Sequence, residues 1–165
     1  MNEIPVEKRV YVDECGINEC LVREYGRAGR GVKVEDTRRG RKFQRTNVIS
    51  ARVRESGKVR HVATLCYTQN TDSAFFIEWF RTKLVKSVSK GSTVIMDNAS
   101  FHPKKKLRNL ARRHGLKLLF LPAYSPDYNP IEKDWANMKR TLTDTLPRYG
   151  DVPSAVYGCF GVDIS

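Results

Sequence analysis

The stretch Leu118–Leu142, LLFLPAYSPDYNPIEKDWANMKRTL, indicates how the rest of the chain is organised. It begins as an apolar run that stops at Pro122, continues as a loop with closely spaced prolines, and becomes helical around Asn129–Glu132. Proline has a fixed φ angle and suits the first position of a helix. A strand, a stiff loop and a helix in this order would hold the carboxylate of Glu132 at a fixed point.

Composition sets broad limits on the chain. Its 165 residues suit one domain spanning 1–165, and a 40% hydrophobic content with 7 Phe, 7 Tyr and 2 Trp is enough for a buried core. The formal charge of +12 favours a polyanionic partner, although an acidic membrane surface would fit as well. The sequence has neither an apolar run of about 18 residues that could span a membrane nor the apolar segment of a signal peptide.

The four cysteines follow no metal-binding pattern. Four residues separate Cys15 from Cys20, and no second pair follows that would complete a zinc site. We expect Cys15, Cys20, Cys66 and Cys159 to be structural thiols in a reducing compartment. Chemistry at Cys15 or Cys20 is the alternative.

Hydrophobic periodicity predicts three strands followed by alternating helices and strands. The expected strands are 9–16, 47–54, 59–68, 93–96 and 116–121, and the expected helices are 71–89, 103–115 and 130–146. Strands that alternate with helices should run parallel to one another and to the first strand. The result is an α/β fold with a mixed five-stranded sheet flanked by helices. The Gly- and Arg-rich segment 26–45 is expected to be irregular, and Pro153 begins a last short segment.

Two carboxylates upstream of Glu132 lie at unusual positions. Asp13 lies inside the first strand, where burying an unpaired carboxylate is costly, and Asp97 ends the fourth. Sites in open α/β sheets collect at the carboxyl ends of parallel strands, so these two residues would meet if their strands are neighbours. Adjacent carboxylates repel one another unless they are protonated or bridged by a cation, and Mg²⁺ prefers oxygen ligands.

Glu132 has two interpretations. Asn129 to Glu132 has the spacing of a capping box with Pro130 at the first helical position, which would give Glu132 a role in the helix start alone. On a helical wheel, the expected buried stripe is Ile131, Trp135, Met138 and Leu142. Glu132 and Lys139 lie along one edge of this stripe and Asp134 along the other. A helix docked by the stripe would turn Glu132 toward the end of the sheet.

Three segments resemble the DDE transposases of bacterial insertion sequences, in the branch related to mariner elements. They are VYVDE at 10–14, VIMDNASFH at 94–102 and LPAYSPDYNPIEKDWANMKR at 121–140. The resemblance covers about residues 10–146, and it implies an RNase H-like fold, in agreement with the expected order of elements. By this resemblance the catalytic triad corresponds to Asp13, Asp97 and Glu132.

The resemblance also implies a chemistry and a set of partners. The reaction would be phosphoryl transfer assisted by two Mg²⁺ or Mn²⁺ ions, with Asp13 bridging both ions and Asp97 and Glu132 each holding one. Such enzymes cut DNA at transposon ends and join the 3′ end to target DNA, and this branch typically inserts at TA dinucleotides. We therefore expect transposon-end and target DNA as partners, a homo-oligomer on DNA, and a cytoplasmic location associated with the bacterial nucleoid.

Polar side chains near the expected triad are candidates for DNA contacts. They are Asn98, His102, Lys104, Lys105, Lys106, Arg108 and Lys139. The alternatives are a solvated helix face for the lysines and arginine, a turn role for Asn98, and a supporting or helix-start role for His102. For Tyr124, Ser125 and Asp127 in the loop, rigidity is favoured over catalysis.

Similar transposases normally carry helix-turn-helix modules before the catalytic domain, whereas this chain begins at the first expected strand. We expect such a module to be absent, so that recognition of terminal repeats would need a separately encoded N-terminal protein, or the chain to be a truncated remnant. Another RNase H-like nuclease and a non-catalytic DNA-binding remnant are the alternative functions. The signature from Pro122 to Glu132 disfavours the first alternative, and the intact triad disfavours the second.

Overall fold

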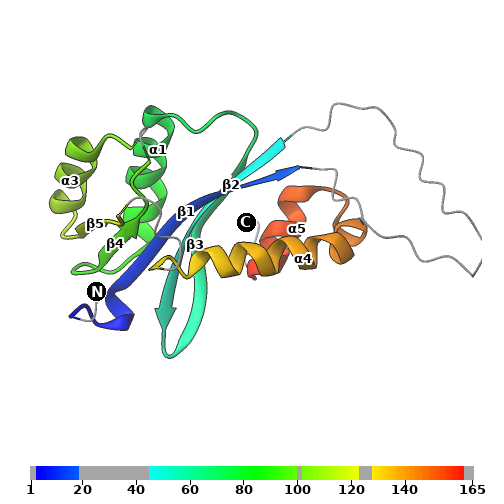
Figure 1. Cartoon of the computed structure of the whole chain (residues 1–165), viewed down its shortest axis with the longest axis horizontal. Coiled ribbons are helices and arrows are strands. Elements are labelled where there is room, and N and C mark those ends of the chain that lie inside the picture. Colours follow the sequence, from blue (N-terminus) through cyan, green and yellow to red (C-terminus); the bar gives the residue numbers. More distant parts are fainter. Residues whose placement is uncertain (1–2, 19–44, 100–101, 123–127, 162–165) are drawn as a thin grey trace, which may run out of the picture.

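A computed structural model describes residues 3–18, 45–99, 102–122 and 128–161 (Figure 1). The strands are β1 (Arg9–Asn18), β2 (Arg45–Glu55), β3 (Lys58–Tyr67), β4 (Thr93–Met96) and β5 (Lys117–Phe120). The helices are η1 (Val6–Lys8), α1 (Ser73–Trp79), η2 (Phe80–Leu84), α2 (Val85–Ser87), α3 (Lys104–Arg113), α4 (Ile131–Tyr149) and α5 (Val152–Phe160). Most of the segment 26–45 lies outside the described residues, as do Cys20, Tyr124, Ser125 and Asp127.

The five strands form one mixed sheet in the order β3-β2-β1-β4-β5. The first three strands pair antiparallel, whereas β4 runs parallel to both β1 and β5. A tight turn with positive φ at Ser56 and Gly57 joins β2 to β3. The predicted α/β architecture and strand directions are therefore confirmed, and β1 lies at the centre of the sheet beside β4.

Helices cover both faces of the sheet, and successive side chains of β1 point alternately into the two cores. On one face, Val10 and Val12 pack with residues of α1, η2 and α3, including Phe76, Phe80, Leu84 and Leu107. On the other face, Tyr11 and Cys15 pack with residues of α4 and α5, including Ile131, Trp135, Met138, Leu142 and Val156. Asp13 has the same parity as Tyr11 and Cys15, so it points toward α4.

The helical segment after β3 contains a π-helical turn that the sequence did not predict. Phe76, Phe80 and Leu84 are spaced by four residues and fully buried. In an α-helix each step of four residues moves about 40° around the axis, so such a series drifts off one face. The wider π turn of η2 reduces this drift and allows all three side chains to enter the core.

The C-terminal part contains more helix than expected. Helix α4 continues past Leu146 and through Pro147 to Tyr149, where Gly150 in the left-handed conformation ends it. Proline removes one backbone hydrogen bond, but α5 packs against α4 and supports the last turn. Asp151 caps α5 by accepting a hydrogen bond from the Ser154 backbone amide at 2.8 Å. In the described part of the chain, no helix has the length and apolar character needed to cross a membrane.

Candidate active site

The strand register places Asp13 beside Asp97. Val12 of β1 pairs with Met96, the last residue of β4, in the parallel ladder, and the next residue along the chain is an aspartate in both cases. Both carboxylates therefore lie at the carboxyl end of β4 near the middle of the sheet, as their positions predicted. Asp97 is exposed, and its Oδ1 accepts a hydrogen bond from the Ala99 backbone amide at 3.3 Å.

Helix α4 brings Glu132 to the same region. Its buried stripe is the predicted one, Ile131, Trp135, Met138 and Leu142. Trp135 Nε1 donates a hydrogen bond to Asp13 Oδ2 at 3.0 Å, which ties the helix directly to β1. Glu132 lies in the first turn, is exposed, and is close enough for its negative charge to raise the pKa of Asp13. The fold thus gathers three carboxylates that are distant in sequence.

The structure corrects the capping-box interpretation of Glu132. Helix α4 begins at Ile131 with Pro130 as its N-cap residue, and the Glu132 backbone amide donates to the backbone carbonyl of Asn129 at 3.2 Å. The side-chain Oδ1 of Asn129 is buried and has no hydrogen-bond partner, so it does not cap the helix. Because proline has no donor and no polar side chain, the helix begins without the reciprocal bonds of a capping box.

Asp13 is costly to ionise in this environment. Burial raises its pKa from 3.8 to about 7, and the negative charges of Glu132 and Glu14 act in the same direction. Hydrogen bonds from the Glu14 backbone and the Trp135 indole lower the pKa, but by less. A nearby cation would reverse this balance by favouring the carboxylate form.

The donor chemistry of the three carboxylates fits a hard divalent cation, although their side chains do not converge on one point. Among the described residues, no group of three or more His, Cys, Asp and Glu side chains is arranged to hold a metal ion. Mg²⁺ often keeps several waters and uses only one or two carboxylates, so a complete protein cage is not required. Asp97 and Glu132 are exposed, so each can change rotamer toward Asp13.

His102 lies behind Asp97 rather than on the surface. Its Nδ1 is 3.3 Å from Asp97 Oδ1, its Nε2 is 3.7 Å from Glu14 Oε1, and its ring packs 4.4 Å from that of Phe76. The residue is only 5% exposed, which corrects the expectation of a direct DNA contact and favours the supporting role. Sequence reasoning missed Glu14, although its place after Asp13 on a strand predicts that it points to the opposite face.

The two edges of the α4 stripe have different surroundings, as the helical wheel predicted. On the Glu132 edge, Lys139 is close enough to lower the pKa of the Cys15 thiol, although burial raises that pKa by more. On the other edge, Asp134 Oδ2 accepts hydrogen bonds from Arg52 Nε at 2.8 Å and from His61 Nε2 at 3.0 Å. Burial acts to raise the pKa of Asp134, but these two partners outweigh it and leave the pKa below its usual range.

The other candidate DNA contacts lie on and before α3. Asn98, Lys105 and Lys106 are exposed. Lys104 and Arg108 lie over the ring of Phe120 on β5, with Nζ 5.8 Å and Cζ 5.3 Å from its centroid. Such cation–π contacts hold the two long side chains against the protein while their charges stay near the surface.

The three described cysteines are free thiols, Cys15, Cys66 and Cys159. Burial raises the pKa of each one, to about 11 for Cys66. Because the thiolate is the reactive form, these side chains are poor nucleophiles and poor metal ligands. This agrees with the structural role predicted for them.

The fold and the placement of the carboxylates together define an RNase H-like α/β domain with an acidic site at the strand ends. The chain belongs to the DDE superfamily endonucleases, whose family model matches residues 8–152. No curated protein sequence matches this chain.

Solved structures support the same fold at low sequence identity. The Mos1 transposase paired-end complex with the left transposon end matches with a TM-score of 0.61 and 14% identity, over 94% of this chain and 52% of that one. The Mos1 mariner paired-end complex with Mn matches with a TM-score of 0.57 and 14% identity, over 97% of this chain and 53% of that one. A chain of the simian T-cell lymphotropic virus intasome in complex with PP2A regulatory subunit B56 gamma matches with a TM-score of 0.64 and 11% identity, over 95% and 48%. The present chain thus spans about half the length of these proteins.

Proposed function

We propose that this chain is the catalytic domain of a transposase, which cuts DNA at transposon ends and transfers the cut strand to target DNA. Its catalytic residues are Asp13, Asp97 and Glu132. The observation that supports the proposal is the placement of Asp13 on β1 beside the end of β4, where Asp97 follows, with Glu132 in the first turn of α4 close enough for its charge to act on Asp13. Membership of the DDE endonuclease family supports it.

Each element has a separate task in this proposal. Trp135 holds Asp13 through the indole N–H, and the buried stripe of α4 holds Glu132 at the sheet end. His102 and Glu14 support Asp97 from the other face of the sheet. When bound at these carboxylates, two divalent ions, Mg²⁺ or Mn²⁺, would supply positive charge for the attacking and leaving oxygens of phosphoryl transfer. Asn98, Lys105, Lys106 and Lys139 would contact DNA phosphates.

The proposed partners follow from the same similarity. The similar Mos1 structures are a paired-end complex with a transposon end and one with Mn, so we propose that this chain also works on DNA as an oligomer with a divalent metal. The proposal has further parts. They are insertion at TA, a bacterial insertion-sequence origin, action at the nucleoid in the cytoplasm, and a separately encoded N-terminal DNA-binding protein.

Strand cleavage tests the proposed activity. The substrate is a labelled duplex carrying the inverted repeats that flank the gene, incubated with Mg²⁺ or Mn²⁺ over a range of concentrations and with EDTA as the control. We expect metal-dependent cleavage at the repeat end, followed by joining to a second duplex.

The same assay distinguishes the alternatives. Preferred cleavage of an RNA–DNA hybrid or a four-way junction would indicate another RNase H-like nuclease. DNA binding without cleavage under any metal condition would indicate a non-catalytic remnant. The double variant Asp13→Asn/Asp97→Asn controls for a contaminating nuclease, because it should bind DNA and cut nothing.

A further inference from the structure

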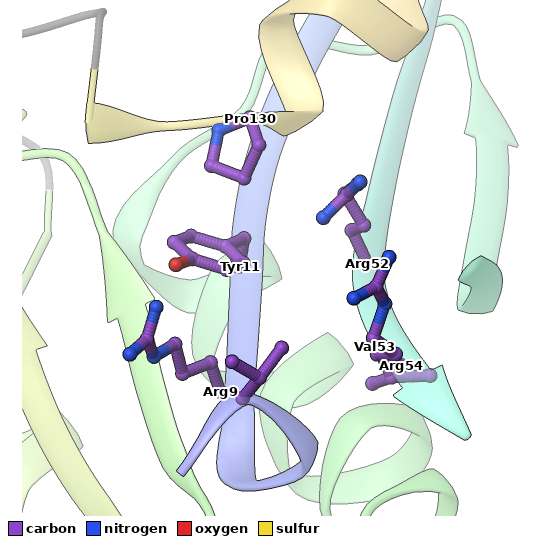
Figure 2. A pocket seen from close by; sticks show the side chains of 7 residues that line it. Arg9, Tyr11, Arg52, Val53, Arg54 and Pro130 are labelled. Atoms are coloured by element: carbon purple, nitrogen blue, oxygen red, sulfur yellow. The ribbon is translucent and has the colours of Figure 1, made fainter. Parts of the chain in front are cut away.

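A basic cavity lies under the start of α4, on the same face of the sheet as Asp13. Its volume is about 210 Å³, and its lining includes Arg9 and Tyr11 of β1, Arg52 and Arg54 of β2, and Pro130. Figure 2 shows the Tyr11 ring between Pro130 and Arg9, with the two β2 arginines on the neighbouring strand. Tyr11 and Arg52 are direct partners in the β1–β2 register, so their side chains share one face.

Two of these arginines are held in place by the protein. Arg52 Nε donates to Asp134 Oδ2 at 2.8 Å, and Arg9 Nε donates to the backbone carbonyl of Ile4 at 2.9 Å. A guanidinium is planar, so a bond at Nε also fixes the direction of its two terminal amino groups. An anion in the cavity would therefore meet donors whose orientation is already set.

Arg54 gives the cavity positive charge beyond that of the Arg52–Asp134 ion pair. Asp134 shares its single negative charge between Arg52 and His61. Arg54 is exposed, and within the described ranges no carboxylate lies at ion-pair distance from it. Arginine pairs with phosphate through two parallel hydrogen bonds, which makes a phosphodiester a suitable ligand for such a site.

The cavity adjoins the proposed catalytic carboxylates. Tyr11 precedes Asp13 by two residues on β1, a separation of about 7 Å along the strand, and Arg9 precedes it by four, a separation of about 13 Å. Pro130 likewise precedes Glu132 by two residues. A nucleic-acid strand with one phosphate at the carboxylates would carry a neighbouring phosphate toward the arginines. Positive charge here would also offset the repulsion between three carboxylates and a polyanion.

We propose that the cavity of Arg9, Arg52 and Arg54 binds a phosphate of the DNA backbone one or two nucleotides from the phosphate that is cut. This assignment rests on the proposed function, because that function places the reacting phosphate at Asp13, Asp97 and Glu132. The site fixes the position of the strand and makes no contact that reads its sequence.

Duplex binding without metal, in EDTA, tests the charge contribution. Arg54→Ala should weaken binding several-fold at low salt and reduce the slope of log K against log salt by about one. The matched control is Arg81→Ala, which removes the same charge from η2 on the other face of the sheet, where Arg81 is exposed and pairs with Glu78. Arg81→Ala should change binding less than about twofold. Equal effects of the two substitutions would overturn the proposal.

A scan of the DNA locates the phosphate itself. Single methylphosphonates, which remove the charge of one phosphate, are placed one at a time around the cut position. One position should weaken binding to the wild-type protein several-fold and have no further effect on Arg54→Ala. Independent losses at every position would show that Arg54 contacts no particular phosphate and would overturn the assignment. If Arg54→Ala changes the oligomeric state of the protein and leaves its DNA affinity unchanged, the assignment is overturned. The ligand of the cavity would then be a carboxylate of another protein chain.

The two proposals fail in different ways. Suppose that the wild-type chain cuts DNA and Asp13→Asn does not, but every methylphosphonate weakens binding equally in wild type and Arg54→Ala. In that case Arg54 is coupled to no phosphate, the cavity assignment fails, and the proposed function stands. If no metal supports cleavage but one phosphate is coupled to Arg54, the cavity binds DNA and the proposed function fails.

Discussion

Two carboxylates beside helix α4, Asp134 on the helix itself and Asp13 on β1, have opposite electrostatic environments. On one edge, Asp134 meets Arg52 and His61, and its pKa lies below the usual range although burial acts to raise it. On the other edge, burial raises the pKa of Asp13 to about 7, and its side-chain hydrogen-bond donor is the neutral indole of Trp135. The negative charges of Glu132 and Glu14 add to this cost.

This difference indicates a structural role for the charge of Asp134 and a chemical role for the carboxylate of Asp13. Asp134 links α4 to β2 and β3, and the protein supplies the positive charge that it needs. Asp13 is left beside other carboxylates, which is costly unless a cation comes from outside the chain. Strongly shifted carboxylates of this kind are characteristic of functional sites. Three substitutions test this contrast, in order of decreasing effect on stability.

Asp13→Asn should stabilise the metal-free protein. At pH 8 in EDTA we expect a gain of about 4 kcal/mol in the free energy of unfolding, since each unit of pKa shift corresponds to about 1.4 kcal/mol. The folded pKa of about 7 exceeds the unfolded value of 3.8, so the wild type loses stability as the pH rises between them. The gain should therefore shrink toward pH 4. Urea unfolding at pH 4, 6 and 8 measures it, and a loss of stability at pH 8 would contradict the assigned environment.

Asp134→Ala should change the stability in the opposite direction, by about half as much. Its removal leaves Arg52 and His61 without their shared carboxylate, and we expect a loss of about 2 kcal/mol at pH 7, less than for a fully buried pair because Asp134 is partly exposed. The folded pKa is lowered, so this contribution is present above the unfolded value and disappears as the pH falls through the folded pKa. Unfolding curves at pH 7 and pH 3 would show it. An unchanged stability at pH 7 would mean that the charge cluster does not hold α4.

Glu132→Gln should change stability least. The side chain is exposed and takes no part in a capping box, so the free energy of unfolding should change by less than about 0.5 kcal/mol. Thermal unfolding at pH 7 measures this effect, with Asp134→Ala as the destabilised comparison. A loss near 1 kcal/mol would restore the capping interpretation.

Much of the fold and of the acidic site could be predicted from the sequence. The alternation of strands, the apolar run before Asp97 and the stripe on α4 depend on local periodicity, which a sequence displays directly. The prediction that Asp13 and Asp97 lie close together required one assumption, that β1 and β4 are neighbours. The observed pairing of these two strands confirms that assumption.

Features that depend on tertiary packing could not be predicted in the same way. The π turn of η2 and the continuation of α4 through Pro147 depend on packing against other elements. His102 is buried between Glu14, which is 88 positions away in the sequence, and Asp97, which is 5 positions away. No local pattern predicts such a contact. The arginine cavity was missed because its members are separated on two strands and look like ordinary surface charges in sequence.

Strand cleavage by Glu132→Gln, compared with wild type and with Asp134→Asn, tests the central claim most directly. All three proteins are assayed on the same transposon-end duplex at saturating Mn²⁺, below the unfolding transition of each. Glu132→Gln should unfold at the wild-type temperature and cut no DNA above background, whereas Asp134→Asn should be less stable and still cut. Cleavage at the wild-type rate by folded Glu132→Gln would contradict the assignment of Glu132 to the catalytic site.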